Sequence, residues 1–182
     1  MSSAEKLSDF IAQTQHLADE EAFVAEHPYP FLVREATKGR VPLPQPGRGT
    51  KRLERQAALP TVGDGFMEGE VWIHRVFPRD PEGETVKIGR DEGCDLHVGD
   101  GSISAVHAEF SIDFSADEKR FFVRDNQSAN GTFVNGDRLD VGAQEELEDM
   151  DSIRLGPVVK LQFFTAPGFF QFLSMYRRIK KP

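Results

Sequence analysis

The chain reads Gly89-Arg90, then Ser104-Ala-Val-His107, then Ser128-Ala-Asn-Gly-Thr132 and then Asn135-Gly136, with short apolar segments between these groups. Glycine and Asn-Gly steps are typical of tight turns. An arginine, a hydroxyl and an amide beside such turns are the donors that a surface needs to hold a tetrahedral dianion, since arginine offers a fixed fork of N–H groups. Each of these four residue groups alone is weak evidence for a binding site. Together and in this order they indicate binding of a phosphate group rather than catalysis.

The segments around these marks have the period of β-strands. Alternating or continuous apolar residues predict strands at 71–77, 84–88, 94–98, 106–112, 120–125, 132–134, 152–155 and 158–164. Turn signals such as Asp91-Glu-Gly93 and Gly99-Asp-Gly101 separate them. Many short strands with regular turns favour an all-β sandwich, and the absence of a helical period between them disfavours a βαβ nucleotide-binding fold.

The order and spacing of the marked residues resemble the forkhead-associated (FHA) domain, a phosphothreonine-binding β-sandwich of two antiparallel sheets. The resemblance covers roughly residues 71–164. It implies that Arg90 and Ser104 contact the phosphate and that Asn130 holds the peptide backbone beyond the phosphothreonine. It also implies a supporting role in the loops for a larger group: Gly89, His107, Ser128, Gly131, Thr132, Asn135 and Gly136.

Two positions depart from the pattern of that family. Ala105 follows the phosphate-binding serine, where the family often has arginine, lysine or asparagine. Ala129 precedes the motif asparagine, where lysine, arginine or threonine is common. The resemblance therefore implies a site with its central contacts present and two auxiliary contacts missing, and weaker binding than in the family at large.

Composition divides the chain into four parts. Residues 1–36 form an N-terminal extension with an amphipathic helix from Ser3 to Glu26, started by a capping box of Ser2 and Glu5. Residues 37–64 are a proline- and glycine-rich linker with room for a short helix at 50–59, residues 65–165 the sandwich, and residues 166–182 an aromatic and basic C-terminal helix. Both helices are expected to pack on the sandwich. Recruitment of a partner by the first, or contact of the second with an anionic membrane surface, remains the alternative.

Charge and cysteine content limit the partners. The chain has a net charge of -8, but residues 64–165 hold 10 basic and 22 acidic side chains, a net charge of -12. Such a field repels a nucleic-acid backbone, so DNA and RNA are disfavoured as partners. One cysteine, no long apolar run and no basic leader at the N-terminus lead us to expect a cytoplasmic protein without disulfides.

Other candidate sites are weaker. Cys94 and His97 form a single short pair without a second cluster, so neither a metal nor another cofactor is expected. Ser104 and His107 lack a nucleophile elbow, and we expect no enzymatic activity. The acidic run 144–151 lacks the glycine and spacing of a calcium loop and is predicted to be a solvated loop.

The sequence thus predicts a non-catalytic adaptor that binds a phosphothreonine-containing protein, a Ser/Thr kinase or its substrate. A phospho-independent scaffold that assembles through the sandwich and its helices is the alternative, and a homo-oligomer remains open. Thr61, in the run Thr61-Val-Gly-Asp64, is a candidate phosphosite that could serve as a ligand for the same domain.

Overall fold

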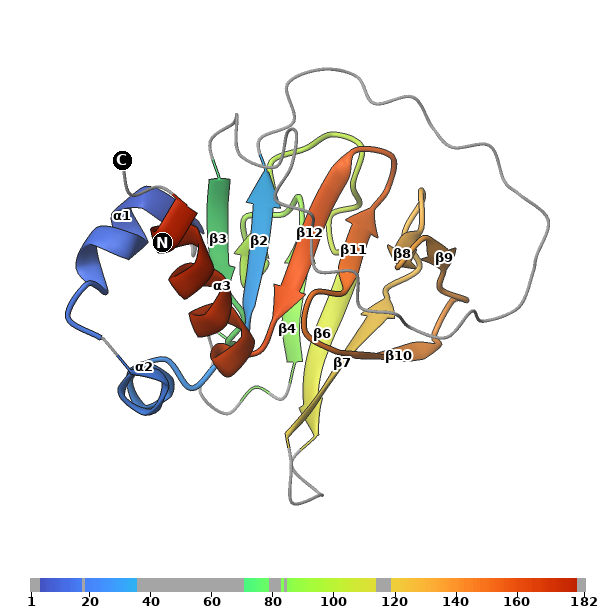
Figure 1. Ribbon diagram of the computed structural model, residues 1–182. Helices are drawn as coiled ribbons and strands as arrows, with labels where there is room; N and C mark the ends of the chain where they lie inside the picture. The colour runs from blue at the N-terminus through green and yellow to red at the C-terminus, as the bar shows by residue number, and fades with distance from the viewer. Residues whose placement is uncertain are drawn as a thin grey trace.

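Two β-sheets lie face to face, and three helices cover part of the outer face of one of them (Figure 1). The structure is a computed structural model that describes residues 4–17, 19–35, 71–78, 83, 85–113 and 119–179. The predicted linker, including the 50–59 segment and Thr61, lies outside these residues.

The larger sheet has seven strands in the order β1-β3-β2-β12-β11-β8-β9. Their bounds are β1 Ala4–Lys6, β2 Phe31–Glu35, β3 Val71–Arg75, β8 Thr132–Val134, β9 Asp137–Arg138, β11 Ser152–Leu155 and β12 Val159–Phe164. The smaller sheet has the order β10-β7-β6-β4-β5, with β4 Thr85–Gly89, β5 Leu96–His97, β6 Ala108–Asp113, β7 Arg120–Asp125 and β10 Gln144–Leu147. All pairs are antiparallel except the short pair β4–β5, which is parallel.

The main core lies between the two sheets. Leu32, Ile153 and Leu161 from the larger sheet pack with Val86 and Val123 from the smaller one, and each is at most 2% exposed. Because successive residues of a strand point to opposite faces, burying these side chains leaves their neighbours on the outer faces. The predicted all-β sandwich with an N-terminal and a C-terminal helical part is confirmed.

A second core joins the helices to the larger sheet. The helices are α1 Leu7–Gln13, α2 Glu20–Glu26 and α3 Ala166–Ile179. Phe10, Phe23 and Phe169 from these helices bury themselves against Phe31 and Phe164 of the sheet, and the rings of Phe31 and Phe169 stack with centroids 4.1 Å apart. The apolar faces of the helices therefore pack on their own sandwich, as the sequence predicts.

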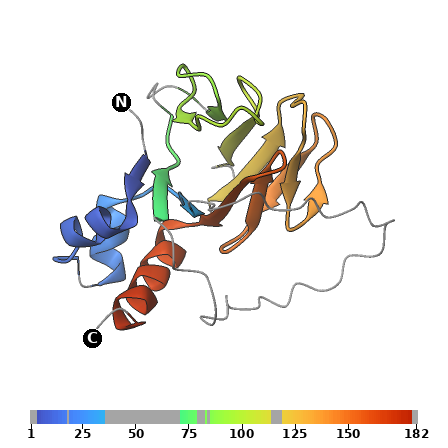
Figure 2. The ribbon, with the colours of Figure 1, turned by 90° about the horizontal axis from the view of Figure 1, so that it is seen from above.

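The helical layer covers only part of the larger sheet. In Figure 1 the helices lie beside β3 and β2, while β8 and β9 lie on the far side of β12 and β11. The view from above agrees, with the blue and red helices at one end and the orange β8–β9 region at the other (Figure 2).

The prediction of one N-terminal helix from Ser3 to Glu26 is wrong. Ala4–Lys6 pairs with β3, and the helical residues divide at Thr14, whose hydroxyl donates to the carbonyl of Phe10 at 2.8 Å. Asp19 then caps a second helix by accepting from the N–H of Ala22 at 2.8 Å. Glu5 accepts from Arg75 and Gln13 side chains, each at 2.7 Å, and so does not act in a capping box.

Four strands were missed, namely the short edge strands β1 and β9 and the longer strands β2 and β10. β2 lies in the middle of the larger sheet, although its residues belong to the segment 1–36 predicted as a helical extension. Its run Phe31-Leu32-Val33 shows no polar alternation because both faces are buried, Leu32 in the main core and Phe31 with Val33 under the helices. β10 occupies the start of the run predicted as a solvated acidic loop and pairs with β7. As an edge strand it carries charged side chains, which oppose pairing with other chains.

Candidate functional site

The first loop of the site begins where β4 ends. The N–H groups of Arg90 and Asp91 donate to the carbonyls of Ser104 and Ala105, each at 3.0 Å, so this loop is fastened to the segment before β6. Gly89 allows the contact, because a Cβ atom there would lie 2.0 Å from the Ala105 carbonyl oxygen. The Arg90 side chain is exposed, and its guanidinium makes no hydrogen bond or ion pair with any other residue that the structure describes.

His107 holds the second loop from within. It is fully buried, with Nδ1 accepting from the N–H of Ser104 at 3.0 Å and Nε2 lying 3.1 Å from the Gly131 carbonyl oxygen. These partners require the tautomer with hydrogen on Nε2. Burial lowers the pKa of His107 below its usual value, against the opposing effects of the Gly131 carbonyl and Asp125. The neutral ring therefore orients two loops.

The Ser104 hydroxyl forms no hydrogen bond with His107. It accepts a hydrogen bond from the N–H of Ala129 at 3.0 Å, which ties the second loop to the third. A hydroxyl has one donor and two acceptor positions, so its O–H can still donate to a bound oxyanion. The pair Ser104 and His107 therefore lacks the contact between hydroxyl and imidazole on which a nucleophilic serine depends.

Asp125 organises the third loop, between β7 and β8. Its buried carboxylate accepts from the N–H of Ser128 at 3.0 Å, from the hydroxyl of Ser128 at 2.6 Å and from the hydroxyl of Thr132 at 2.7 Å. Burial alone would raise the pKa of Asp125, but the hydrogen bonds from Ser128 and Thr132, with His107 nearby, outweigh it and hold the pKa below its usual value. Ser128 in turn accepts from the N–H of Gly131 at 2.9 Å.

We expect Asp125→Asn to lower the free energy of unfolding by about 1–3 kcal/mol, because the amide turns its NH₂ group toward at least one donor. Asp113→Asn is the matched control, since Asp113 lies at the other end of the same sheet in a partly exposed ion pair with Arg120 and should change stability by less than about 1 kcal/mol. Urea denaturation at pH 7 measures both. Equal effects of the two substitutions would contradict the role given to Asp125.

Asn130 lies exposed at the tip of the third loop. One N–H of its side chain donates to the carbonyl of Ser102 at 2.7 Å, and Ser102 is held by the carboxylate of Asp100 through its N–H and hydroxyl. The second N–H and the side-chain carbonyl of Asn130 stay available for a ligand. The next residue, Gly131, has φ +81°, a conformation that favours glycine.

Asn135 and Gly136 form the two-residue turn between β8 and β9. Both have positive φ, 53° and 94°, which is the requirement of a type I′ hairpin. The Asn135 side chain donates to Asp151 at 2.8 Å and accepts from the N–H of Ser152 at 3.0 Å, so it fixes the start of β11. This pair supports the fold beside the site.

The structure thus joins the loops that carry Arg90, Ser104 and Asn130 at one end of the sandwich. Ala105 and Ala129, the two departures from the family pattern, are exposed there. The sequence reasoning missed Asp125 and Asp100, which position the loops. An Asp two or three residues before a serine is a signal of such a turn, since short carboxylates accept from nearby N–H groups.

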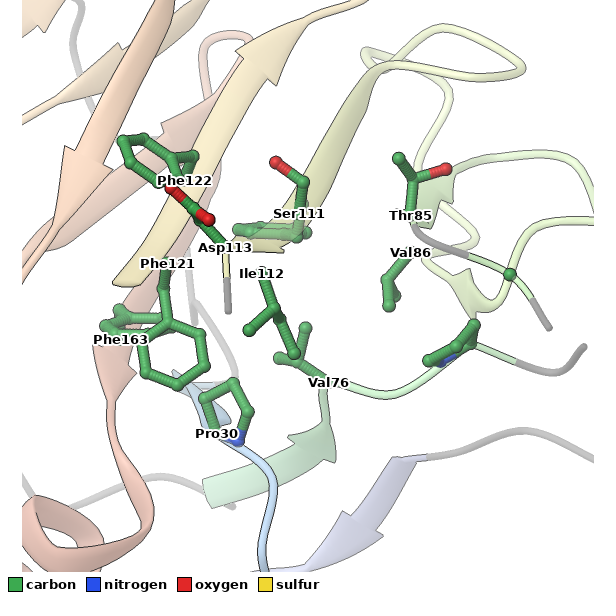
Figure 3. A pocket seen from close by; sticks show the side chains of 13 residues that line it. Pro30, Val76, Thr85, Val86, Ser111, Ile112, Asp113, Phe121, Phe122 and Phe163 are labelled. Atoms are coloured by element: carbon green, nitrogen blue, oxygen red, sulfur yellow. The ribbon is translucent and has the colours of Figure 1, made fainter. Parts of the chain in front are cut away.

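A cavity lies at the other end of the sandwich. It has a volume of about 560 Å³, and Figure 3 shows Pro30, Val76, Ile112, Phe121 and Phe163 around it. β4 begins there at Thr85 and ends at Gly89, so the strand spans the distance between the cavity and Arg90. The cavity therefore takes no part in the site.

The remaining candidate residues form no second site within the described part of the chain. Cys94 is buried, its thiol contacts the Ala105 carbonyl at 3.2 Å, and burial raises its pKa. Among the described residues no group of three or more histidine, cysteine or acidic side chains could hold a metal ion. Nor does the described part of the chain include a helix that is long and apolar enough to span a membrane.

Comparison with known proteins places these loops in a family. Residues 86–156 match the family model described as FHA domain. The chain is 34% identical over 90 residues to transcription factor 19-like protein of Mus musculus, covering 47% of this chain and 34% of that protein. It is 32% identical over 113 residues to transcription factor 19 of Homo sapiens, covering 59% and 32%. The chain spans about a third of the length of these curated relatives.

One solved structure supports the fold, and a second is similar over a shorter part of the chain. The yeast Dun1 FHA domain, determined by NMR with a doubly phosphorylated peptide derived from Rad53, matches with a TM-score of 0.50 and 24% identity over 76% of this chain and 75% of that one. The MEK1 FHA domain, crystallised with a phosphothreonine peptide of HOP1, matches with a TM-score of 0.43 and 30% identity over 51% and 87%. The chain carries an FHA domain, matched over residues 86–156 within a sandwich that also includes β2, β3 and β12.

Proposed function

We propose that this chain is a non-catalytic adaptor that binds a phosphothreonine peptide through Arg90, Ser104 and Asn130. FHA domains are phosphothreonine-binding modules, and the partner would be a phosphorylated protein, a Ser/Thr kinase or its substrate. One observation carries the proposal. Backbone and side-chain hydrogen bonds fasten the three loops together, while the Arg90 guanidinium, the Ser104 O–H, and one N–H and the carbonyl of the Asn130 side chain are left for a ligand.

The chemistry of each group suits its role. A phosphothreonine carries a charge of about -1.5 to -2 at pH 7, which the arginine fork meets with parallel N–H donors. The Ser104 hydroxyl supplies a neutral donor to another phosphate oxygen, and Asn130 pairs with a peptide group of the ligand. Since residues 64–165 have a net charge of -12, these local donors have to hold the phosphate against the general field.

The helices give the scaffold alternative no support. Their apolar side chains are buried against the larger sheet, and among the described residues the exposed large hydrophobic side chains are Phe77 and Val141. Phosphopeptide binding is therefore the function that the described surface favours.

A library of fluorescent phosphothreonine peptides, read by fluorescence polarisation, tests the proposal. Each sequence is paired with the unphosphorylated peptide and with its phosphoserine form. We expect a subset of phosphothreonine peptides to bind and the unphosphorylated forms to show no saturable binding. Equal binding of phosphorylated and unphosphorylated members would show that the surface is not a phosphate reader.

A further inference from the structure

A row of three cations and one aromatic ring crosses the part of the larger sheet that the helices leave uncovered. In the strand register, Lys160 lies opposite Arg154, Arg154 opposite Phe133, and Phe133 opposite Arg138. Directly paired residues point to the same face of a sheet. Their strand neighbours Leu161, Ile153 and Val134 are buried in the main core, so these four side chains, here called the basic row, lie on the outer face.

The basic row has no acidic partner in the described structure. The Arg154 guanidinium lies 3.5 Å from the centroid of the Phe133 ring, and Lys160 and Arg138 are exposed. No described carboxylate lies within ion-pair distance of any of the three cations. Like charges placed opposite each other, as in the pair Arg154 and Lys160, destabilise a sheet. An anionic ligand that lies across the row would offset this repulsion. The row is also a local exception in a segment, residues 64–165, whose net charge is -12.

The basic row also adjoins the phosphopeptide site. The Arg154 guanidinium donates to the carbonyl of Gly156 at 2.5 Å, and the N–H of Gly156 donates to the carbonyl of Gly131 at 2.9 Å. A Cβ atom on Gly131 would lie 2.7 Å from Nε of Arg138, so this guanidinium lies against the backbone next to Asn130. A peptide chain that leaves Asn130 along Gly131 would thus meet the basic row without crossing another of the described elements.

We propose that the basic row binds an acidic segment of the same peptide that supplies the phosphothreonine, and so selects ligands with a run of Asp or Glu beside it. The inference rests on the proposed function and adds a preference in sequence to it. Strands in a sheet lie about 4.8 Å apart, so the row from β9 to β12 is about 14 Å long. An extended segment of about four residues covers that length.

A duplex or single-stranded nucleic acid is the less favoured ligand. A long polyanion would meet the acidic remainder of the domain as well as the basic row, while a short acidic segment tied to the phosphothreonine meets the row alone. The domain's charge therefore favours a peptide.

The test extends the best peptide of the library by four residues, through a short Gly-Ser spacer, on its N-terminal or its C-terminal side. Each extension is either Glu-Asp-Glu-Asp or Gly-Ser-Gly-Ser. We expect one of the acidic extensions to raise the affinity about five- to twentyfold over its neutral counterpart at 50 mM salt, and the gain to vanish near 1 M salt because exposed ion pairs are screened.

Two variants locate the effect. Lys160→Glu, and independently Arg138→Ala, should remove most of the gain while leaving the affinity for the neutral peptide within about twofold. Lys87→Glu is the matched control, since Lys87 is an exposed lysine on the outer face of the smaller sheet and its replacement alters the net charge equally. It should keep most of the gain.

The outcomes separate the two proposals. Neutral phosphopeptides that bind without any gain from either acidic extension, or a gain that Lys87→Glu removes as fully as Lys160→Glu, overturn the basic row and leave the phosphothreonine site standing. No binding by any phosphopeptide overturns both. Binding of an oligothymidylate that Lys160→Glu abolishes, without a gain for the acidic peptides, assigns the basic row to nucleic acid and also overturns the inference.

Discussion

Arg90→Ala is expected to lower the affinity for a phosphothreonine peptide at least a hundredfold without changing the thermal midpoint of unfolding. Hydrogen bonds to charged groups contribute about 1.5–3 kcal/mol each, and a bidentate arginine makes two of them, which gives a factor of about a hundred or more. The fold should be unaffected, because the exposed guanidinium has no partner among the described residues and the loop is held by the backbone N–H of Arg90.

Arg120→Ala is the matched control for this substitution. Arg120 is also an exposed arginine on a strand end, but it lies at the cavity end of the sandwich and pairs with Asp113 at 2.7 Å. Titration calorimetry with one phosphopeptide should show full affinity for this variant. If Arg90→Ala bound the phosphopeptide with the same affinity as Arg120→Ala, the phosphate would have to be held elsewhere.

His74 is expected to make the fold unstable in mild acid. It lies on β3 opposite Leu32, on the side of the sheet that faces the main core, and is 2% exposed. Neither ring nitrogen has a hydrogen-bond partner among the described residues, and burial with Arg34 nearby lowers the pKa of His74 to about 4. Burying the charged ring is thus strongly unfavourable.

The direction of the pH effect follows from linkage. In the unfolded chain the ring takes up a proton below its ordinary pKa of about 6.5, whereas the folded protein resists protonation until about pH 4. The stabilising contribution is present above pH 6.5 and is lost as the pH falls through this window, by about 3 kcal/mol in all.

His74→Leu isolates this contribution. The variant should be at least as stable as the parent at pH 7, because it removes two unsatisfied buried nitrogens. Between pH 7 and pH 4 it should lose about 3 kcal/mol less than the parent, since carboxylates and the other histidines contribute equally to both proteins. Urea denaturation across this range measures the difference, and parallel pH profiles would contradict the account.

How far the sequence predicts the structure depends on whether its signals are local. The Asn135-Gly136 turn, the strands around Gly89 and the helix after Thr165 follow from short patterns, and the structure contains all of them. The strand β2 could not be recognised in this way. Its apolar run is buried on both faces, and its partners β3 and β12 lie far away in the sequence.

The site shows the same limit. The loops carrying Arg90, Ser104 and Asn130 come together because groups far apart in the sequence form hydrogen bonds, as the N–H of Ala129 does to the hydroxyl of Ser104, and spacing alone does not reveal such bonds. The role of Asp125 depends on the burial of its carboxylate, and the basic row depends on strand register. Both are properties of the folded chain that no local pattern in the sequence displays.

The account's central claim is that Arg90, Ser104 and Asn130 form one phosphate-dependent surface. A ¹⁵N-resolved NMR titration tests it most directly, with one peptide in its phosphothreonine and unphosphorylated forms. The account predicts that the phosphorylated peptide shifts the amide signals of the three loops around these residues, leaves those around the cavity at Phe121 unchanged, and that the unphosphorylated peptide shifts neither group. Shifts centred on the cavity end, or identical shifts with both peptides, would contradict it.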